Sequence, residues 1–413
     1  MCGIAGFCNF KEDFEENTDY WNFRLEKMRA VLAHRGNDAR GRFLKKHIGL
    51  SHSRLAIRDI LCGDQPMTRT HNGYEYTICY NGEIYNTDEL IPELSENGFV
   101  CSTTSDTEVI LYAYIHWGAD FVNRLNGIFA FAIWDAAKNR LLLYRDRVGV
   151  KPLFYAIRGD SLVFGSEPKA CFAHPAVKPE LDKQGLQELL AIGPAHTSGL
   201  SLFKDLFEVL PGHFMIYSRD GLHDETYWEL TSREHTESYR DTVAHTRFLV
   251  EDAVKRQMVS DVPVCTFLSG GIDSSIVTAI AANYMNTRGK TLNTFSFDFK
   301  DNDRYFKANA FQPERDLPYV NRMLEEYETA HSYLECDENS LFKALFAAVD
   351  AKDMPGMTDV DSSLLYFCSL VSRKNKVALT GECADEIFGG YPWFYRKELL
   401  ERYGFPWSSD VAP

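Results

Sequence analysis

The pattern of predicted strands and helices changes between the two halves of this chain, and this change constrains the fold more than any other feature. Up to residue 217, short segments rich in aromatic and branched residues follow one another with few helices between them. From residue 239 on, apolar strands alternate with amphipathic helices. Closely spaced strands favour antiparallel sheets covered by helices, whereas alternation favours a parallel sheet with crossover helices. We therefore predict an α+β domain over 1–217, a polar linker over 218–238 and an α/β domain over 239–413.

Aromatic and β-branched runs mark the predicted strands, and apolar residues three or four apart mark the predicted helices. The predicted strands are residues 2–9, 48–55, 75–80, 129–134, 140–144, 153–157, 162–164, 214–217, 262–268, 291–297, 331–335 and 377–379. The predicted helices are one that carries Leu25, Met28 and Leu32, and residues 87–96, 106–117, 239–258, 276–284, 317–326, 340–349 and 362–372, the last capped by Asp361.

Composition excludes several classes of function. The chain has 413 residues, enough for two or three domains, and a net charge of −15. An acidic chain lacks the clustered cations that bind a phosphate backbone, so we expect no nucleic acid partner. No apolar run approaches the ~20 residues that span a bilayer and no basic-then-apolar leader begins the chain, so we expect a cytoplasmic protein without a membrane partner. Its ten cysteines include no CxxC pair, which argues against a zinc knuckle.

Cys2 is the residue with the greatest catalytic potential. Removal of Met1 would leave one residue that carries both a thiol and a free α-amine. An α-amine has an ordinary pKa of about 7.7–8.0, so part of it is neutral at neutral pH and can take the proton of the thiol. The alternative is a small buried residue on a strand, because cysteine is among the most buried residue types.

Two polar motifs interrupt the strands of the first half. Arg54 lies in an otherwise apolar strand, where a guanidinium is costly unless it binds an anion or forms a structural ion pair. Asn81 and Gly82 follow a predicted strand, and Asn-Gly is typical of a hairpin turn. The same two residues could instead present an amide and an N–H group to a developing oxyanion. The residues alone leave both pairs of alternatives open.

Two further motifs also have plain structural interpretations. Ser105 and Glu108 form a capping box, so Asp106 is either an acidic first-turn residue or the partner of a substrate ammonium group. Residues 145–151 alternate charges around a glycine, which favours a structural network of ion pairs in a loop.

Taken in order, six motifs of the first half resemble the glutaminase domain of class II amidotransferases, which are N-terminal-nucleophile enzymes with an αββα sandwich. The motifs are residues 1–6, 34–38, 54–57, 81–86, 105–108 and 145–147. The resemblance implies that Cys2 attacks the side-chain amide of glutamine with its own α-amine as the base, and that Asn81 and Gly82 form the oxyanion hole. One departure is Asn37, where this family usually has proline. The implied glutamine-binding residues are Arg54 for the α-carboxylate, Asp106 for the α-ammonium, Glu83 for positioning, and Leu55, Ala56, Ile57, Arg58, Asn81 and Gly82.

A glycine-rich string, Ser269-Gly270-Gly271-Ile272-Asp273-Ser274-Ser275, connects a buried strand to a helix in the second half. Glycines let backbone N–H groups approach a phosphate, and the start of the helix adds its positive end. No Lys-Ser or Lys-Thr pair follows the glycines, so this is not a Walker P-loop. An ordinary strand-to-helix connection is the structural alternative, but the complete string favours a pyrophosphate site.

The last predicted strand leads into a turn with three carboxylates, those of Glu382, Asp385 and Glu386. Such a cluster can simply favour the start of a helix. At the carboxyl end of a parallel strand, where ligands of α/β sheets bind, the same carboxylates could hold Mg²⁺ or orient an activated carboxylate. We therefore expect magnesium as a cofactor of this half.

Both stretches of the second half resemble the synthetase domain of glutamine-dependent asparagine synthetases, which belong to the PP-loop ATP pyrophosphatases. The resemblance implies that Glu382 supports the formation of a β-aspartyl-AMP intermediate and that Asp273 and Asp385 serve Mg²⁺. Two departures are Cys383, where the motif usually has glycine, and length, because family members continue well beyond Tyr391. We therefore expect an incomplete synthetase domain. The implied ATP-binding residues are Leu268, Ser269, Gly270, Gly271, Asp273, Ser274, Phe297, Thr380 and Gly381.

The two resemblances together imply ATP-dependent amidation of L-aspartate to L-asparagine with ammonia from L-glutamine, giving glutamate, AMP and pyrophosphate. Glutamine, aspartate and ATP are the expected small-molecule partners, and a homodimer is the assembly that we consider. A sheltered passage for ammonia between the two sites is a further hypothesis. Two other functions stay open, namely a glutaminase with an inactive second domain and a PP-loop amidotransferase that acts on a different carboxylate. A non-enzymatic subunit is the remaining alternative.

Overall fold

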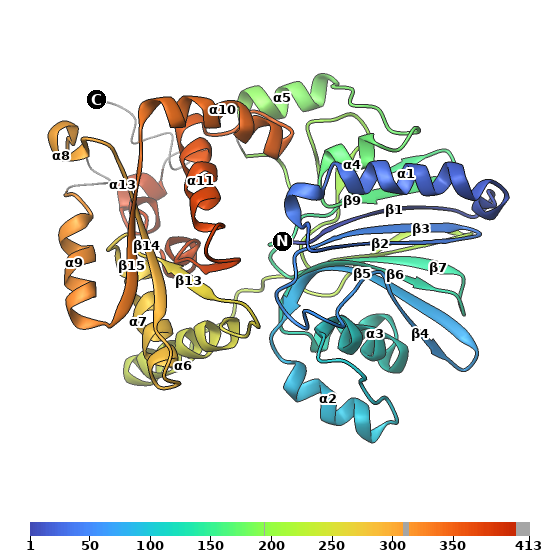
Figure 1. Cartoon of the computed structure of the whole chain (residues 1–413), viewed down its shortest axis with the longest axis horizontal. Helices are drawn as coiled ribbons and strands as arrows, with labels where there is room; N and C mark the ends of the chain where they lie inside the picture. The colour runs from blue at the N-terminus through green and yellow to red at the C-terminus, as the bar shows by residue number, and fades with distance from the viewer. Residues whose placement is uncertain (194, 309–313, 402–413) are drawn as a thin grey trace. The chain divides into compact units, whose positions relative to one another are not determined.

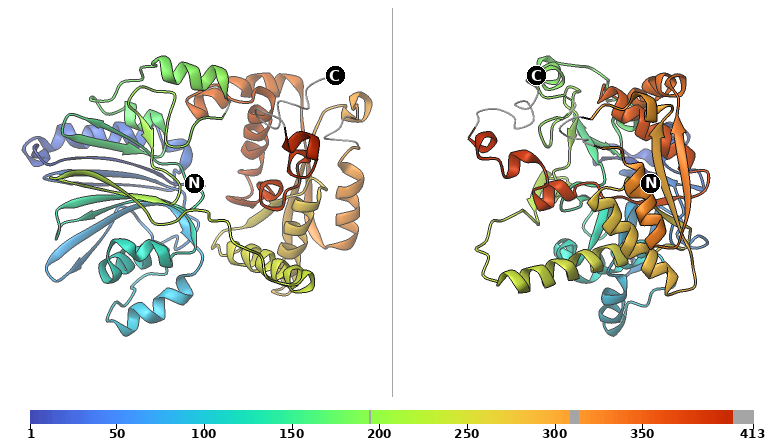
Figure 2. Two further views of the ribbon diagram at one scale, coloured as in Figure 1. Left: turned by 180° about the vertical axis from the view of Figure 1, so that it is seen from behind. Right: turned by 90° about the vertical axis from the view of Figure 1, so that its left-hand side faces the viewer.

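The computed structural model of the chain describes residues 1–193, 195–308 and 314–401. It divides into two compact units, each with its own sheets and helices (Figures 1 and 2). The first unit contains residues 1–236 and 343–362. The second contains residues 237–342 and the described residues from 363 on. The predicted end of the second domain, residue 413, lies outside the described residues.

Two six-stranded sheets, A and B, form the first unit, and neighbouring strands run antiparallel in both. Sheet A has the order β10 (Phe207–Glu208), β8 (Phe154–Arg158), β9 (Ser161–Gly165), β1 (Gly3–Asn9), β3 (Ile48–Arg54) and β2 (Ala39–Lys45). Sheet B has the order β12 (Gly221–Thr226), β11 (His213–Ser218), β7 (Arg140–Arg145), β6 (Gly127–Asp135), β5 (Tyr74–Ile84) and β4 (Met67–His71).

Helices cover the outer face of each sheet, as Figure 1 shows. Along β1, Ile4 and Cys8 belong to the apolar core between the two sheets, whereas Ala5 and Phe7 belong to the core under the helices. This alternation follows from the two-residue period of a strand. The unit is an αββα sandwich, which confirms the predicted fold of the first half. Its helices are α1 (Thr18–Ala30) and α4 (Pro168–Phe172) over sheet A, α2 (Thr87–Glu96) and α3 (Asp106–Trp117) over sheet B, and α5 (Lys183–Ala191).

The prediction differs from the structure at polar strands. Residues 218–238 are predicted to be a linker, but residues 221–226 form β12, the edge strand of sheet B. Most of its side chains are exposed, so the strand has no apolar alternation that a sequence pattern could show. The strands β2, β4 and β10 are missing from the prediction as well.

A four-stranded parallel sheet is the centre of the second unit. Its order is β15 (Thr329–Cys336), β14 (Leu292–Phe299), β13 (Val264–Phe267) and β16 (Val377–Leu379). The alternation of strands and helices confirms the predicted α/β fold. Within the described residues, no helix has both the length and the apolar composition needed to cross a membrane. The helices of the second half are α6 (Tyr239–Gln257), α7 (Ile272–Asn286), α8 (Asn302–Tyr305), α9 (Leu317–Glu326), α10 (Glu338–Lys352), α11 (Thr358–Val371), α12 (Ala384–Phe388) and α13 (Lys397–Leu400).

A short segment of the second half, residues 343–362, belongs to the first unit. The backbone N–H of Lys169 donates to Oδ2 of Asp353 at 3.0 Å, and the Nζ of Lys169 lies 3.2 Å from Oδ1 of the same residue. The helix α11 begins at Thr358, so the predicted cap, Asp361, is wrong and lies inside the helix. Its carboxylate accepts hydrogen bonds from Nζ of Lys352 and from the backbone N–H of Met357, both at 2.7 Å.

Candidate active sites

Cys2 lies immediately before β1, next to the end of β3. The register of these strands pairs Gly3 with Ser53, and it brings the Sγ of Cys2 to 3.4 Å from the backbone N of Leu55. Burial raises the pKa of the Cys2 thiol, and the hydrogen bond with Leu55 only partly offsets this. The thiol is therefore protonated at neutral pH and needs a base before it can attack.

The α-amine at the N-terminus has the properties of such a base. In the structure this amine belongs to Met1, and burial lowers its pKa to about 5, with the charges of Arg35 and Lys151 acting in the same direction. Removal of Met1 would place the α-amine on Cys2, beside the same two cations. An amine with a depressed pKa is neutral near pH 7 and can accept the proton of the thiol.

A chain of ion pairs holds the backbone of Cys2. Nε of Arg35 donates to the carbonyl oxygen of Cys2 at 2.9 Å, and its Nη1 lies 2.7 Å from Oε1 of Glu167. The Nζ of Lys169 is 3.0 Å from Oε2 of Glu167. Although burial opposes it, hydrogen bonds from His34 and Arg35 lower the pKa of Glu167 to about 2. This carboxylate is therefore charged, and it fixes the arginine that holds the nucleophile.

Lys151 is a buried cation next to the N-terminus, and the sequence predicts for it only a place among the alternating charges of a loop. Its Nζ lies 3.1 Å from Sδ of Met1, and burial lowers its pKa. Its backbone N–H donates to Oδ2 of Asp146 at 2.9 Å, and Arg145 pairs with Glu208 at 2.8 Å. The loop 145–151 thus contains the expected ion-pair network, but it also delivers a charged side chain to the site. In the sequence, Lys151 is one of several alternating charges and carries no signal of its own.

Asn81 and Gly82 lie inside β5 rather than in a hairpin turn. They pair with Ala130 and Phe129 of β6, so turn chemistry does not explain them. A Cβ at Gly82 would lie 2.3 Å from the carbonyl oxygen of Ile128, which only glycine avoids. Asn81 is 1% exposed, and its Nδ2 has no hydrogen-bond partner among the described residues. Such a buried donor is costly unless a ligand accepts its hydrogen bond.

The carboxylates of Glu83 and Asp106 and the guanidinium of Arg58 are close enough to shift the pKa of Glu83. Oδ2 of Asp106, in the first turn of α3, accepts hydrogen bonds from the hydroxyl of Tyr80 at 2.8 Å and from the N–H of Ile84 at 3.0 Å. Burial raises the pKa of Glu83 to about 8, and the charge of Asp106 adds to the rise, whereas Arg58 opposes it. This mixture of anions and cations complements a zwitterion such as a free amino acid.

The guanidinium of Arg54 is occupied by its own loop. Nη1 lies 3.0 Å from Oδ1 of Asp64 and donates to the carbonyl oxygen of Ile60 at 3.1 Å. Nη2 donates to the carbonyl oxygens of Arg58 and Asp59. The side chain of Asp64 is 74% exposed. The structural ion pair is therefore present, and it shows that Arg54 can hold a carboxylate at an accessible position.

The segment between Arg54 and Arg58 is held in place by the neighbouring motif. The N–H of Ala56 donates to Oδ2 of Asp38 at 2.8 Å. A Cβ at Gly36 would lie 2.3 Å from the carbonyl carbon of Arg54, so the 34–38 loop packs directly on this segment. Asn37 is exposed and is not needed for these contacts. Of the predicted residues in this segment, Leu55 contacts Cys2, and Ala56 and Ile57 follow Leu55 in the chain.

In the second unit, the turn after β13 folds around the start of α7. The N–H of Ser269 donates to Oγ of Ser274 at 3.2 Å, and the two hydroxyl oxygens are 3.0 Å apart. Gly270 has a φ of +83°, and a Cβ there would lie 2.7 Å from the Cβ of Tyr319. Gly271 is the N-cap of α7, and no side chain accepts a hydrogen bond at this cap. The first N–H groups of the helix are therefore available to an anion.

Three predicted ATP-binding residues line one small cavity at the carboxyl ends of β13 and β14. Leu268, Ser269 and Phe297 are among the walls of this cavity, whose volume is about 30 Å³. Ligands of parallel sheets bind at this end of the strands. The position of the cavity agrees with the predicted site.

The acidic turn that follows β16 touches the glycine-rich turn. Thr380 and Gly381 come directly after β16, which pairs with β13. A Cβ at Gly381 would lie 2.7 Å from the N of Ser274 and 2.8 Å from the Cβ of Asp273. Cys383 has a φ of +69°, a conformation that favours glycine, so its departure from the usual motif has a structural cost. The structure thus brings the two motifs of the second half together.

The carboxylates of Asp273 and Asp385 are the candidate metal ligands. Burial raises the pKa of Asp273, and the nearby charge of Asp385 adds to this. Across the part of the chain that the structure describes, no group of three or more His, Cys, Asp and Glu side chains is arranged to hold a metal ion. Magnesium is commonly held by one or two carboxylates together with substrate phosphates. The pair therefore fits a magnesium ion that arrives with a nucleotide rather than an all-protein metal cage.

Comparison with protein families assigns each half of the chain. Residues 1–228 match the family described as "Glutamine amidotransferase domain", and residues 245–412 match the family described as "Asparagine synthase". The first match contains every residue of the predicted glutamine site, and the second contains every residue of the predicted nucleotide site.

Several curated proteins are similar to the chain over nearly all of its length. It is 48% identical to the glutamine-hydrolyzing asparagine synthetase 3 of Bacillus subtilis, over 100% of this chain and 66% of that protein. It is 32% identical to the putative glutamine-hydrolyzing asparagine synthetase 2 of Methanocaldococcus jannaschii, over 95% of this chain and 76% of that protein. It is also 32% identical to amidase chyE of Penicillium rubens, over 100% of this chain and 62% of that protein. The chain thus spans about two thirds of the length of these relatives.

Proposed function

Because this chain belongs to the family of glutamine-dependent asparagine synthetases, we propose that it transfers the amide nitrogen of L-glutamine to the side-chain carboxylate of L-aspartate and consumes ATP. The products are asparagine, glutamate, AMP and pyrophosphate. Two observations support the proposal. The first site combines carboxylates and a guanidinium, which complement the charges of a free amino acid. In the second site, the turn after β16 contacts the glycine-rich turn after β13. A homodimer is likewise a proposal, which sedimentation of the purified chain tests directly.

In the first step, Sγ of Cys2 attacks the side-chain amide carbon of glutamine while the α-amine takes the proton of the thiol. The Nδ2 of Asn81 and the N–H of Gly82 donate to the resulting oxyanion. The amine then gives its proton to the departing nitrogen, so ammonia leaves and a γ-glutamyl thioester forms. Water hydrolyses the thioester to glutamate and restores the thiol. The buried Nδ2 of Asn81, which has no partner among the described residues, is the observation that carries this step.

The rest of the first site recognises the amino-acid end of glutamine. Asp106 and Glu83 attract the α-ammonium group, and each carries a raised pKa that a bound cation would lower. Arg54 binds the α-carboxylate by exchanging its bond with the exposed carboxylate of Asp64 for one with the substrate. Arg58 contributes a second positive charge, and its guanidinium is held by donating to the carbonyl oxygen of Ile84 at 2.9 Å and to the hydroxyl of Thr87 at 3.2 Å.

In the second step, an oxygen of the aspartate side-chain carboxylate attacks the α-phosphorus of ATP, and pyrophosphate leaves. Adenylation is needed because a carboxylate is a poor electrophile. Ammonia then attacks the acyl carbon, and AMP leaves with the electron pair of the broken bond. The residues assigned to pyrophosphate are Ser269, Gly270, Gly271, Asp273 and Ser274, those assigned to the rest of ATP are Leu268, Phe297, Thr380 and Gly381, and Glu382 supports adenylation.

Asp273 and Asp385 would hold Mg²⁺ at this turn. When bound, the ion would neutralise negative charge on the phosphates of ATP. The rest of the turn would bind and orient the nucleotide through hydroxyl and N–H groups, and the hydrogen bonds between Ser269 and Ser274 hold the turn in shape.

We also propose that ammonia passes between the two sites without entering bulk water. Water would protonate ammonia to a cation that is not a nucleophile, and it would hydrolyse the acyl-adenylate. Incubation with ¹⁵N-amide glutamine and excess unlabelled ammonium tests this proposal. Asparagine that keeps most of the label supports a sheltered passage, and heavy dilution of the label contradicts it.

A second candidate function rests on the similarity to amidase chyE. The same two half-reactions could amidate a carboxylate other than that of aspartate, because both the glutaminase site and the nucleotide turn are independent of the acceptor. Aspartate-dependent release of pyrophosphate distinguishes the two functions.

The proposed function is tested by the stoichiometry of the full reaction. The purified chain with glutamine, aspartate and ATP is expected to form one glutamate, one asparagine, one AMP and one pyrophosphate per turnover. Pyrophosphate that appears without aspartate would contradict the assigned acceptor. Glutamate that appears while ATP is not consumed would identify a glutaminase with an inactive second domain.

A further inference from the structure

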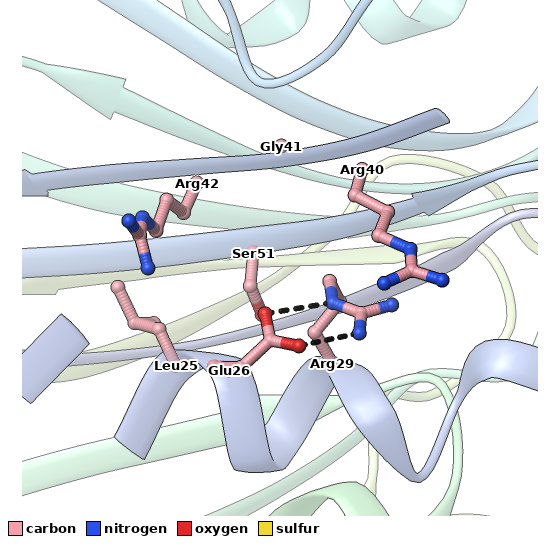
Figure 3. A pocket seen from close by; sticks show the side chains of 7 residues that line it. All are labelled: Leu25, Glu26, Arg29, Arg40, Gly41, Arg42 and Ser51. Atoms are coloured by element: carbon pink, nitrogen blue, oxygen red, sulfur yellow. Dashed lines mark hydrogen bonds and ion pairs between the residues drawn. The ribbon is translucent and has the colours of Figure 1, made fainter. Parts of the chain in front are cut away.

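A cavity of about 300 Å³ lies between α1 and the outer face of sheet A, and its walls are rich in arginine (Figure 3). None of the residues assigned to glutamine, ATP or Mg²⁺ lines it, so it is separate from both proposed sites. The lining residues are Leu25, Glu26, Arg29, Arg40, Gly41, Arg42 and Ser51.

Strand alternation builds this cavity. Arg40 and Arg42 lie two residues apart on the edge strand β2 and therefore face the same side of sheet A. They pair with Ser53 and Ser51 of β3, which are almost completely buried beneath α1. Small serine side chains occupy positions where larger apolar residues would fill the space under the helix. The result is a polar hollow rather than a packed core.

The cavity carries an excess of positive charge. Arg29 forms a bidentate ion pair with Glu26, with Nε 2.9 Å from Oε2 and Nη2 2.5 Å from Oε1. Nη2 of Arg40 donates to the neutral Oδ1 of Asn37 at 3.3 Å. In the described ranges, neither Arg40 nor Arg42 is joined to a carboxylate by an ion pair. Figure 3 shows three guanidinium groups and one carboxylate on the walls of this cavity, so the ionisable residues among its walls carry a net charge of +2.

Exposed arginines on an edge strand have a simpler explanation, because charge on an edge prevents sheets from associating. The hairpin formed by β2 and β3 provides a direct comparison. Lys45 and Lys46 are exposed cations at its tip, and each lies near a carboxylate, that of Glu75 at 3.7 Å and that of Asp13 at 3.4 Å. Arg40 and Arg42 line the cavity, and neither forms an ion pair with a carboxylate of residues 1–193, 195–308 or 314–401. Protection of the sheet edge is therefore a sufficient explanation for the two lysines, but it does not explain why the two arginines line a cavity.

We propose that this cavity binds a small anion of the phosphate class with at least two negative charges, held between Arg40 and Arg42. A guanidinium donates two parallel hydrogen bonds to a phosphate, and two guanidinium groups that form no ion pair with a carboxylate of the described residues match the charge of a dianion. The volume, about 300 Å³, is at the lower end of small-molecule sites, so it admits a phosphorylated metabolite as well as free phosphate. The proposal does not depend on the reaction proposed above.

Equilibrium dialysis of the full chain against ³²P-labelled inorganic phosphate tests the proposal. The comparison is between the wild-type chain, R40Q/R42Q and the matched control K45Q/K46Q, which also removes two positive charges from the same hairpin. The glycine-rich turn at 269–274 is unchanged in all three, so it contributes equally to each. We expect a saturable component whose affinity falls about tenfold or more in R40Q/R42Q and stays within twofold in the control.

Glu26→Gln gives an independent test in which the affinity should change in the opposite direction. It removes the carboxylate that pairs with Arg29, so the net charge of the cavity becomes more positive by one. We expect its affinity for phosphate to rise severalfold. Circular dichroism and a thermal melt of each variant show that the comparison is between folded chains. The absence of saturable binding to the wild-type chain, or equal binding by the wild type and R40Q/R42Q, would overturn the proposal. Succinate that binds the cavity as tightly as phosphate would overturn the assignment to phosphate.

Discussion

The backbone N of Leu55 lies 3.4 Å from the Sγ of Cys2, although the two residues are far apart in the sequence. This contact depends on the register of two strands, because Gly3 of β1 pairs with Ser53 of β3. A shift of one residue would turn every side chain of the strand to the other face. The nucleophile is thus positioned by a rigid sheet.

Substitution of Asn81 by Ala tests the oxyanion hole. Loss of one such donor typically lowers kcat about 10²–10³-fold, because the bond is strongest in the transition state. We expect this fall in kcat for glutamine hydrolysis with little change in KM. The matched control is Asn86→Ala, which removes a buried amide that donates to the carbonyl oxygen of Arg124 at 2.9 Å. A variant N81A that keeps more than half of the wild-type kcat would contradict the assigned role.

Substitution of Lys151 by Met tests the electrostatic setting of the α-amine. The positive charge of Lys151 lowers the pKa of the N-terminal amine, so its removal should raise that pKa. Because the amine must be neutral to act as a base, the acid limb of the pH–kcat/KM profile should move to higher pH, by about one unit or less. Lys151→Arg keeps the charge and should keep the limb in place. A lower rate with an unmoved limb in K151M would mean that the lysine is only structural.

His52 predicts how stability depends on pH. Its Nε2 lies 3.0 Å from the carbonyl oxygen of Tyr80, and burial lowers its pKa to about 4. A histidine in the unfolded chain has a pKa near 6.5, so between these values the unfolded state binds the extra proton. Neutral His52 makes its full contribution to the free energy of unfolding above about pH 6.5, and this contribution is lost as the pH falls towards 4.

Urea unfolding at pH 7.5 and pH 5 measures this dependence. We expect the wild-type free energy of unfolding to fall by up to about 2 kcal/mol for this group, and we expect a smaller fall in His52→Gln. The buried His174, whose pKa burial also lowers to about 4, remains in both proteins. His223→Gln removes an exposed histidine and should keep the wild-type difference. Equal falls in the wild type and H52Q would refute the assignment.

Substitution of Cys383 by Gly should stabilise the acidic turn. The residue has a φ of +69°, and a left-handed conformation costs a side-chain-bearing residue about 1–2 kcal/mol relative to glycine. We expect a gain of about 1 kcal/mol in the free energy of unfolding of the second unit, measured by urea unfolding. Cys62→Gly is the control, because Cys62 is also exposed but has no positive φ. A C383G variant that is less stable than the wild type would contradict backbone strain at Cys383.

The two ends of α3 could be predicted from local chemistry. α3 spans Asp106–Trp117 as predicted, because Oγ of Ser105 accepts a hydrogen bond from Thr107 and Gly118 ends the helix with a φ of +75°. The capping box is only half formed, however. The carboxylate of Glu108 bonds to the N–H groups of Ser102 and Thr103 instead of returning to Ser105. Glu108 makes these bonds because the turn at residues 102–103 lies beside it in the fold, and no local sequence pattern predicts this position.

Features that depend on which strand, loop or helix packs against a segment could not be predicted from the sequence. Asn-Gly is typical of a turn, yet Asn81 and Gly82 continue β5 because β6 pairs with them. Lys151 reaches the N-terminus only because its loop is tied to Asp146. The arginine-lined cavity exists only where β2 meets α1, and β2 has too little apolar alternation to be recognised as a strand. Each of these features is formed by contacts between residues that are distant in sequence.

In the proposed first step, a sulfur and an amine on one terminal residue release the nitrogen of glutamine. Intact-mass spectrometry of the purified chain, before and after an acid quench with glutamine, tests it most directly. We expect a chain without Met1 that gains one γ-glutamyl group, and we expect Cys2→Ser or Cys2→Ala to abolish this gain. An active chain that retains Met1, or a γ-glutamyl group that still forms in the Cys2→Ala variant, would rule out this mechanism.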